Sequence, residues 1–122
     1  AKYALDELGT AMELLEDGLK VSRDLGDGAA EGRMLGRMAS ISADQGALEL
    51  SNQYGLEAIE KSSEAGDNQT VGEQYFILGL NRKEEGNVDQ AAEYCKNSIA
   101  AFQRTGMKAY IDRSMKLLEE LK

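Results

Sequence analysis

The side chains that could carry out chemistry in this sequence are few. The 122 residues include no histidine, and the single cysteine is Cys95. Histidine is the commonest base and metal ligand at neutral pH, and a cysteine nucleophile needs a neighbouring base to form its thiolate. Cys95 lies on the apolar side of a helical pattern. We therefore expect a packed thiol rather than a nucleophile, and no enzyme activity.

Two further patterns suggest ligand sites, but their surroundings do not suit them. The glycine-rich stretch 26–32 is similar to a dinucleotide-binding loop, yet such a loop follows a β-strand and a helical pattern precedes this one. Asp24, Asp27 and Glu31 are close in sequence but lack the spacing of a calcium-binding EF-hand loop. Helix capping and solvation explain these carboxylates. The sequence therefore predicts no cofactor and no metal site.

Charge and composition exclude further classes of function. The formal net charge is -8, whereas nucleic-acid binding needs a basic face to displace counterions. No apolar run approaches the ~18–20 residues of a membrane span, so no membrane partner is expected. One cysteine cannot form an internal disulfide, which favours a cytoplasmic protein. The chain begins at Ala1 rather than Met, so we expect a piece of a longer array.

The apolar residues predict an all-α protein with six helices. Large side chains recur at i, i+3, i+4 and i+7, which gives each helix one apolar stripe, and the absence of proline suits long helices. Glycines interrupt the pattern, because glycine readily ends a helix and a following aspartate caps the next one. The helices are predicted at about 2–25, 29–45, 47–65, 69–85, 88–105 and 108–121.

The same helix pair recurs with a period of 40 residues. The aligned columns include Leu14, Tyr54 and Tyr94, and also Gly26, Gly66 and Gly106. One helix pair cannot bury both of its stripes, so successive pairs must stack, and the short loops make neighbouring helices antiparallel. The sequence therefore predicts an α-solenoid as a single domain, 1–122. Its two full units are expected at about 28–66 and 68–106, between a half unit at each end.

The second unit resembles the tetratricopeptide repeat family. It matches the family pattern at Tyr75, Leu78, Gly79, Gly86 and Ala91. Arg82, Cys95 and Ser98 depart from that pattern, and the period is 40 rather than the ~34 residues usual in the family. Gly-Asp also stands where the family has proline. This longer form is similar to the repeats of the Pins/LGN-like class of cell-polarity adaptors.

The resemblance implies a non-catalytic scaffold that holds a partner peptide or helix in a concave groove lined by the first helix of each unit. The groove candidates are Arg33, Arg37, Ser40, Asp44, Glu73, Phe76, Ile77, Leu80, Lys83, Glu84, Arg113, Lys116, Leu117 and Glu120. Phe76, Ile77 and Leu80 are apolar beyond the packing stripe, so they either touch adjacent helices or form a groove floor. Flanked by arginine and lysine, such a floor would suit an acidic peptide with apolar anchors.

A second interpretation is structural and stays open at this point. The chain would then be a designed or excised repeat array that forms a homo-oligomer through its terminal helices. The first helix has no helix before it to cover an apolar face that we expect to include Leu5, Met12 and Leu19. The sixth helix is expected to act as a cap over the last apolar face.

Overall fold

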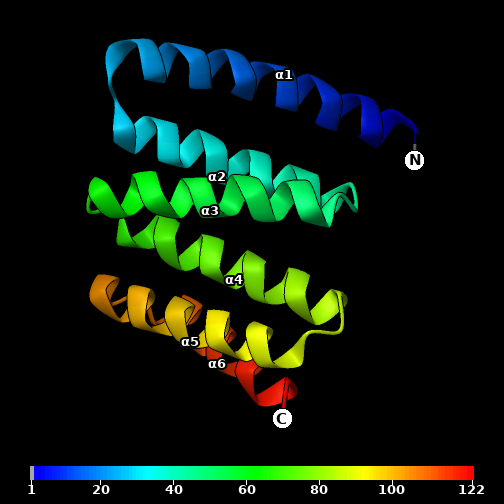
Figure 1. The fold of residues 1–122 in the computed structure, drawn as a ribbon, viewed down its shortest axis with the longest axis vertical. Coiled ribbons are helices and arrows are strands. Elements are labelled where there is room, and N and C mark those ends of the chain that lie inside the picture. The colour runs from blue at the N-terminus through cyan, green and yellow to red at the C-terminus, as the bar shows by residue number, and fades with distance from the viewer. Residues whose placement is uncertain (1) are drawn as a thin grey trace.

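The computed structural model describes residues 2–122, with side chains described from Glu7 onward. Across that range it contains helices and no strand, which confirms the all-α prediction. The helices are α1 (Lys2–Leu25), α2 (Gly28–Asp44), α3 (Leu48–Glu64), α4 (Asn68–Glu84), α5 (Val88–Thr105) and α6 (Lys108–Glu120). Figure 1 shows them stacked in chain order, with α1 and α6 at opposite ends. The predicted helix limits differ from these by no more than one residue.

Glycines at intervals of 20 residues end the first five helices. They are Gly26, Gly46, Gly66, Gly86 and Gly106, and all have φ between 69° and 84°. Residues with a Cβ are strained in this left-handed region. After the first four of these glycines, the next N–H donates to the carbonyl five residues earlier, as from Asp67 to Ser62 at 2.8 Å. This hydrogen bond satisfies a carbonyl that the helix end leaves without a partner. Because it recurs every 20 residues, successive helices are related by a constant step.

Polar side chains cap three of the helices that follow these turns. Asp27, Asp67 and Asn87 each accept a hydrogen bond from the backbone N–H three residues further on, at 3.1–3.2 Å. Ala47 and Met107 hold the equivalent place without a side-chain cap. The predicted Gly-Asp turn is therefore confirmed at both of its occurrences.

Small residues lie where paired helices approach most closely. Ser98 Oγ donates to the Gly72 carbonyl and Ser51 Oγ to the Ala39 carbonyl, each at 2.8 Å. A Cβ added to Gly72 would lie only 2.8 Å from the Phe102 ring. Contacts are densest between α2 and α3 and between α4 and α5. The helices therefore pair as the 40-residue period predicts.

The apolar stripes meet in a layer between successive helices, and this layer contains two separate core clusters. One core cluster consists of Leu19, Leu35, Met38 and Ala58 and another of Phe76, Cys95 and Leu117. Aromatic rings extend this layer, since Tyr75 stacks on Tyr94 with centroids 6.0 Å apart. Tyr110 stacks on Phe102 at 5.0 Å. The layer explains how a thin array can exclude water without a globular core.

The open face of α1 is not the one expected from the sequence. Met12 packs against the first core cluster and Leu19 belongs to it, whereas Leu5 lies outside the described side chains. Among the described side chains of α1, the large apolar residues that are exposed are Leu14, Val21 and Leu25, at 66%, 56% and 77%. The stripe chosen from the sequence is therefore the one that faces α2.

The repeat explains why these other positions are exposed. Leu14 is equivalent to Tyr54 and Tyr94, which pack against the first helix of their own units, as the Tyr75–Tyr94 stack shows. Among the described residues, α1 has no such partner and packs mainly against α2. At the other end, Met115 is equivalent to Tyr75 and is 54% exposed. Among the described residues α6 packs against α5, the second helix of the preceding unit, and has no second helix of its own unit. Each end of the stack is therefore half of a unit.

Two glycines of the first turn offer a test of the backbone argument. Gly26 has φ of 69° and Gly28 does not share that conformation, while an added Cβ at either would meet nothing within 4 Å. Gly26→Ala should lower the free energy of unfolding by about 1–2 kcal/mol. Gly28→Ala should leave it unchanged or raise it by less than about 1 kcal/mol. Chemical denaturation of the two variants measures the difference, and equal stabilities would contradict the assigned turn.

Candidate functional site

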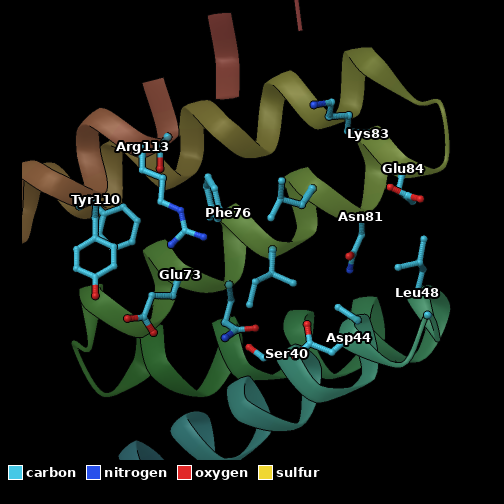
Figure 2. Close-up of a pocket in the computed structure, with 17 residues that line it drawn as sticks. Ser40, Asp44, Leu48, Glu73, Phe76, Asn81, Lys83, Glu84, Tyr110 and Arg113 are labelled. Carbon is cyan, nitrogen blue, oxygen red and sulfur yellow. The ribbon is translucent and has the colours of Figure 1, made fainter. Parts of the chain in front are cut away.

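The first helices of successive units, α2, α4 and α6, enclose a hollow of about 850 Å³. Figure 2 shows Tyr110, Glu73 and Arg113 toward one end of it, and Asp44 and Glu84 at the other. A smaller hollow of about 450 Å³ runs along α2 and the start of α4, and shares Ser40, Glu73 and Gln74 with the first. We call the two hollows together the groove.

The floor of the groove is apolar and lies on α4. Phe76 is 8% exposed, Ile77 is half-buried and Leu80 is 38% exposed. The guanidinium carbon of Arg113 lies 4.5 Å from the centroid of the Phe76 ring, within the range of a cation–π interaction. Phe76 is therefore largely committed to packing, and Leu80 with Ile77 provides the accessible apolar surface.

Most residues expected in the groove line it. The main hollow includes Ser40, Asp44, Glu73, Phe76, Ile77, Leu80, Lys83, Glu84 and Arg113, and the smaller one includes Arg33 and Arg37. Lys116 and Glu120 are exposed but line neither hollow. Leu117 lies in the core rather than on the floor, because it is 4% exposed and packs with Phe76 and Cys95.

The charges of the groove are mixed rather than uniformly basic. Lys83 Nζ lies 3.6 Å from a carboxylate oxygen of Glu120, and both side chains are about half exposed. Such exposed pairs contribute at most about 1 kcal/mol. Carboxylates of Asp44 and Glu84 line the same end of the hollow. An acidic ligand therefore suits only the end that carries the arginines.

A buried hydrogen-bond network that the sequence did not reveal supports the floor. Asn81 Nδ2 donates to Ser51 Oγ at 3.0 Å and to Asn52 Oδ1 at 2.9 Å. Ser51 in turn donates to the Ala39 carbonyl, and Asn52 Nδ2 donates to Glu85 Oε1 at 3.3 Å. Asn81 is 3% exposed and lines the hollow. The network joins α2, α3 and α4 beneath the groove, so it holds two of the lining helices in a fixed relation.

Gln74 is a second buried polar residue whose role the sequence did not reveal. It is almost fully buried, lines both hollows, and its Oε1 has no hydrogen-bond partner among the described residues. A Cβ at position 36 would lie 2.7 Å from Gln74 Nε2, so Gly36 leaves the space that this amide fills. Gln74 and Asn81 are seven residues apart, two turns of one helix face. The spacing of these two amides on one face of the helix is the sequence feature that could have indicated their burial.

Cys95, the single cysteine, has a free thiol and is fully buried. Burial raises the pKa of its thiol, because desolvation disfavours the thiolate. The predicted packed thiol is confirmed. The described residues contain no group of three or more His, Cys, Asp or Glu side chains placed to hold a metal ion. Within the same range, no helix has the length and apolar character needed to cross a membrane.

No protein-family model and no curated protein matches this chain. The class that the structure itself defines is an all-α helical-repeat solenoid, in which the first helices of successive units share a groove. Any ligand must therefore be inferred from the shape, charge and support of the groove.

The network below the floor leads to a stability prediction. Asn81→Ala removes the amide that donates hydrogen bonds to Ser51 and Asn52. It should therefore lower the free energy of unfolding by about 1–3 kcal/mol. Asn97→Ala is the matched control, because Asn97 is half-buried in α5 and alanine is the better helix former. Urea denaturation followed by circular dichroism compares them. If both variants match the wild type, Asn81 does not support the floor.

Proposed function

We propose that this chain is a non-catalytic scaffold that binds a partner peptide or helix in the groove. The observation that carries the proposal is the hollow of about 850 Å³ with accessible Leu80 and Ile77 on its floor. Polar groups of α2, α4 and α6 surround this apolar strip, which is the usual composition of a ligand site. The single free cysteine supports a cytoplasmic location within the same proposal.

Membership of the tetratricopeptide repeat family belongs to this proposal. It is supported by helix pairs that recur every 40 residues and by turn glycines every 20. It is supported as well by the close approach of Gly79 to Cys95 Sγ, where an added Cβ would lie at 3.3 Å. In the family pattern the glycine at this place allows two helices to cross closely.

The proposed mechanism of binding is preorganisation. The helices that line the groove are held by packed side chains and by the Asn81 network, so few groups on the scaffold lose conformational freedom when a ligand binds. Apolar anchors of the ligand would cover Leu80 and Ile77, at about 25 cal/mol for each Å² removed from water. Gln74 would gain a partner if a polar ligand group reached its amide.

The location of the binding surface can be tested with peptides selected from a displayed random library against the wild-type protein. Leu80→Asp should weaken the selected peptides at least about tenfold, because it places a charge on the apolar floor where a central contact is worth about 2 kcal/mol or more. Isothermal titration calorimetry measures the affinities, and circular dichroism confirms that the helices persist.

The matched control for this test is Leu56→Asp. Leu56 is on α3, is exposed to a similar extent and lines neither hollow of the groove. Its replacement should leave the affinity within about twofold. Selected peptides that bind Leu80→Asp as tightly as wild type, or that lose affinity with Leu56→Asp instead, would place the binding surface elsewhere.

Self-association is the second candidate, and the exposed Leu14, Val21 and Leu25 of α1 favour it. α1 is a second helix of a unit and α6 a first helix, so α6 of one copy and α1 of another could complete a unit. Two carboxylates on α6 argue against such a joint. Asp112 and Glu119 are equivalent to Gly32 and Ala39 in α2 and to Gly72 and Gly79 in α4, where the paired helix comes too close for a larger side chain.

Sedimentation across a concentration series distinguishes the two candidates. The wild type should remain a monomer at concentrations up to about 100 μM, since joining the ends would bury the carboxylates of Asp112 and Glu119 at a cost of several kcal/mol each. Glu119 has only the exposed Lys122 as an ionic partner, at 3.2 Å. Asp112→Gly with Glu119→Ala should associate measurably, and a further Leu14→Lys should reverse that association. Wild-type polymers that Leu14→Lys disrupts would instead establish self-association as a property of this chain.

A further inference from the structure

Charged residues along the groove are separated by sign. We define the basic rim as Arg33, Arg37 and Arg113, and the acidic rim as Asp44 and Glu84 together with Glu120, which lies outside both hollows and pairs with Lys83. The three carboxylates are the last residues of α2, α4 and α6, whereas Arg33 and Arg113 lie nearer the start of α2 and α6 and Arg37 lies near the middle of α2. Figure 2 shows Arg113 at the opposite end of the hollow from Asp44 and Glu84. By the 40-residue period, Leu80 is equivalent to Ser40 and lies between the levels of Arg37 and Asp44, whereas Ile77 lies at the level of Arg37.

Charges of the opposite sign occur on both rims, but most of them already have partners. On the basic rim, Asp67 accepts hydrogen bonds from the backbone and hydroxyl of Thr70, and Glu73 accepts one from Gln69. On the acidic rim, Lys83 pairs with Glu120. The three guanidinium groups and the carboxylates of Asp44 and Glu84 make no ion pair within the described chain. These five charges are therefore available to a ligand, although Arg113 also lies over the Phe76 ring. The charge of Glu73 is available too, because the Gln69 amide is neutral.

Helix stability does not explain this arrangement. The C-terminal end of a helix carries a partial negative charge, so a carboxylate there is unfavourable. Three successive groove helices nevertheless end in a carboxylate. The helix dipoles have their positive ends toward the basic rim and their negative ends toward the acidic rim. Side chains and dipoles therefore reinforce one another and produce a field directed across the groove.

The separation of the rims suits a helix. On α2, Asp44 is eleven residues from Arg33 and seven from Arg37, which corresponds to roughly 16 Å and roughly 10 Å at the helical rise of 1.5 Å per residue. An α-helix with its side chains is about 10–12 Å across. A helix lying over Leu80 would therefore have one rim along each side. An extended chain would be too narrow to keep its backbone on the floor and reach both rims.

We propose that the groove selects and orients an amphipathic helix whose apolar stripe has acidic residues along one side and basic residues along the other. This inference rests on the proposed function, and it names the partner of the same site. Only one direction of such a helix brings its acidic side to Arg33, Arg37 and Arg113 and its basic side to Asp44 and Glu84. The opposite direction brings like charges together on both sides, so the groove fixes the polarity of its ligand.

Three synthetic helices test the selection. They share one leucine stripe and a lactam staple, and they carry glutamate on one side with lysine on the other, glutamate on both sides, or lysine on both sides. The mixed helix should bind the wild type at least about tenfold more tightly than either uniform helix, because each uniform helix faces one rim of like charge. Raising the salt concentration should reduce this preference, since the rims are exposed to solvent.

A rim exchange tests the orientation. Arg33→Glu, Arg37→Glu, Asp44→Lys and Glu84→Lys together reverse four of the available charges and leave Leu80 in place. This variant should bind the mixed helix with an affinity within a few-fold of wild type but in the opposite direction. A nitroxide at the peptide N-terminus should broaden amide resonances of one end helix of the groove, α2 or α6, in the wild type. In the variant it should broaden those of the other end helix. Circular dichroism of the variant confirms that the fold persists.

The outcomes separate this inference from the proposed function. Equal affinities for the three helices, with all of them weakened by Leu80→Asp, would overturn the charge selection and leave the groove as the binding site. An unchanged direction in the rim-exchange variant would also overturn it. Failure of all three helices to bind would overturn this inference alone if library peptides still depend on Leu80, and the proposed function as well if they do not.

Discussion

The left-handed turn that recurs every 20 residues is the constraint on which the rest of the structure depends. Each turn needs a residue without Cβ, and each returns the chain antiparallel to the helix before it. Because all five turns share this glycine conformation, corresponding residues of successive units meet corresponding neighbours. The Gly-Asp and Gly-Asn turns add a cap for the helix that follows. A local backbone conformation therefore sets the step of the whole array.

Close packing converts that step into a groove. Gly72 and Ser98 let α4 and α5 approach until a hydroxyl reaches a backbone carbonyl. The second helices are thereby held beside the first, and α2, α4 and α6 are left to share one open side. Asn81 and its partners join α2, α3 and α4 from beneath. The rigidity that a binding surface needs thus arises from contacts that never touch the ligand.

The outcome for particular residues shows how far sequence reasoning extends. Helix limits, turn glycines and the buried Cys95 followed from periodicity and composition. The face of α1 did not, because Met12 and Leu14 both look apolar and only the position of α2 decides which of them is covered. Leu117 was expected to face the groove and lies in the core, since α6 turns that side toward Phe76. Gln74 and Asn81 were overlooked, because amides inside an apolar stripe look like solvent contacts until their partners are known.

By itself, the sequence determined the all-α class, the six helices, their period and the position of every turn. These properties depend on residues close in the chain, through hydrogen bonds and φ preferences that act over a few positions. The tertiary structure alone decided which apolar residues stay accessible, which charges pair and which polar groups are buried without a partner. Those properties depend on helices brought together from distant parts of the chain. The repeat pattern alone does not show which face of a helix has no neighbour to cover it.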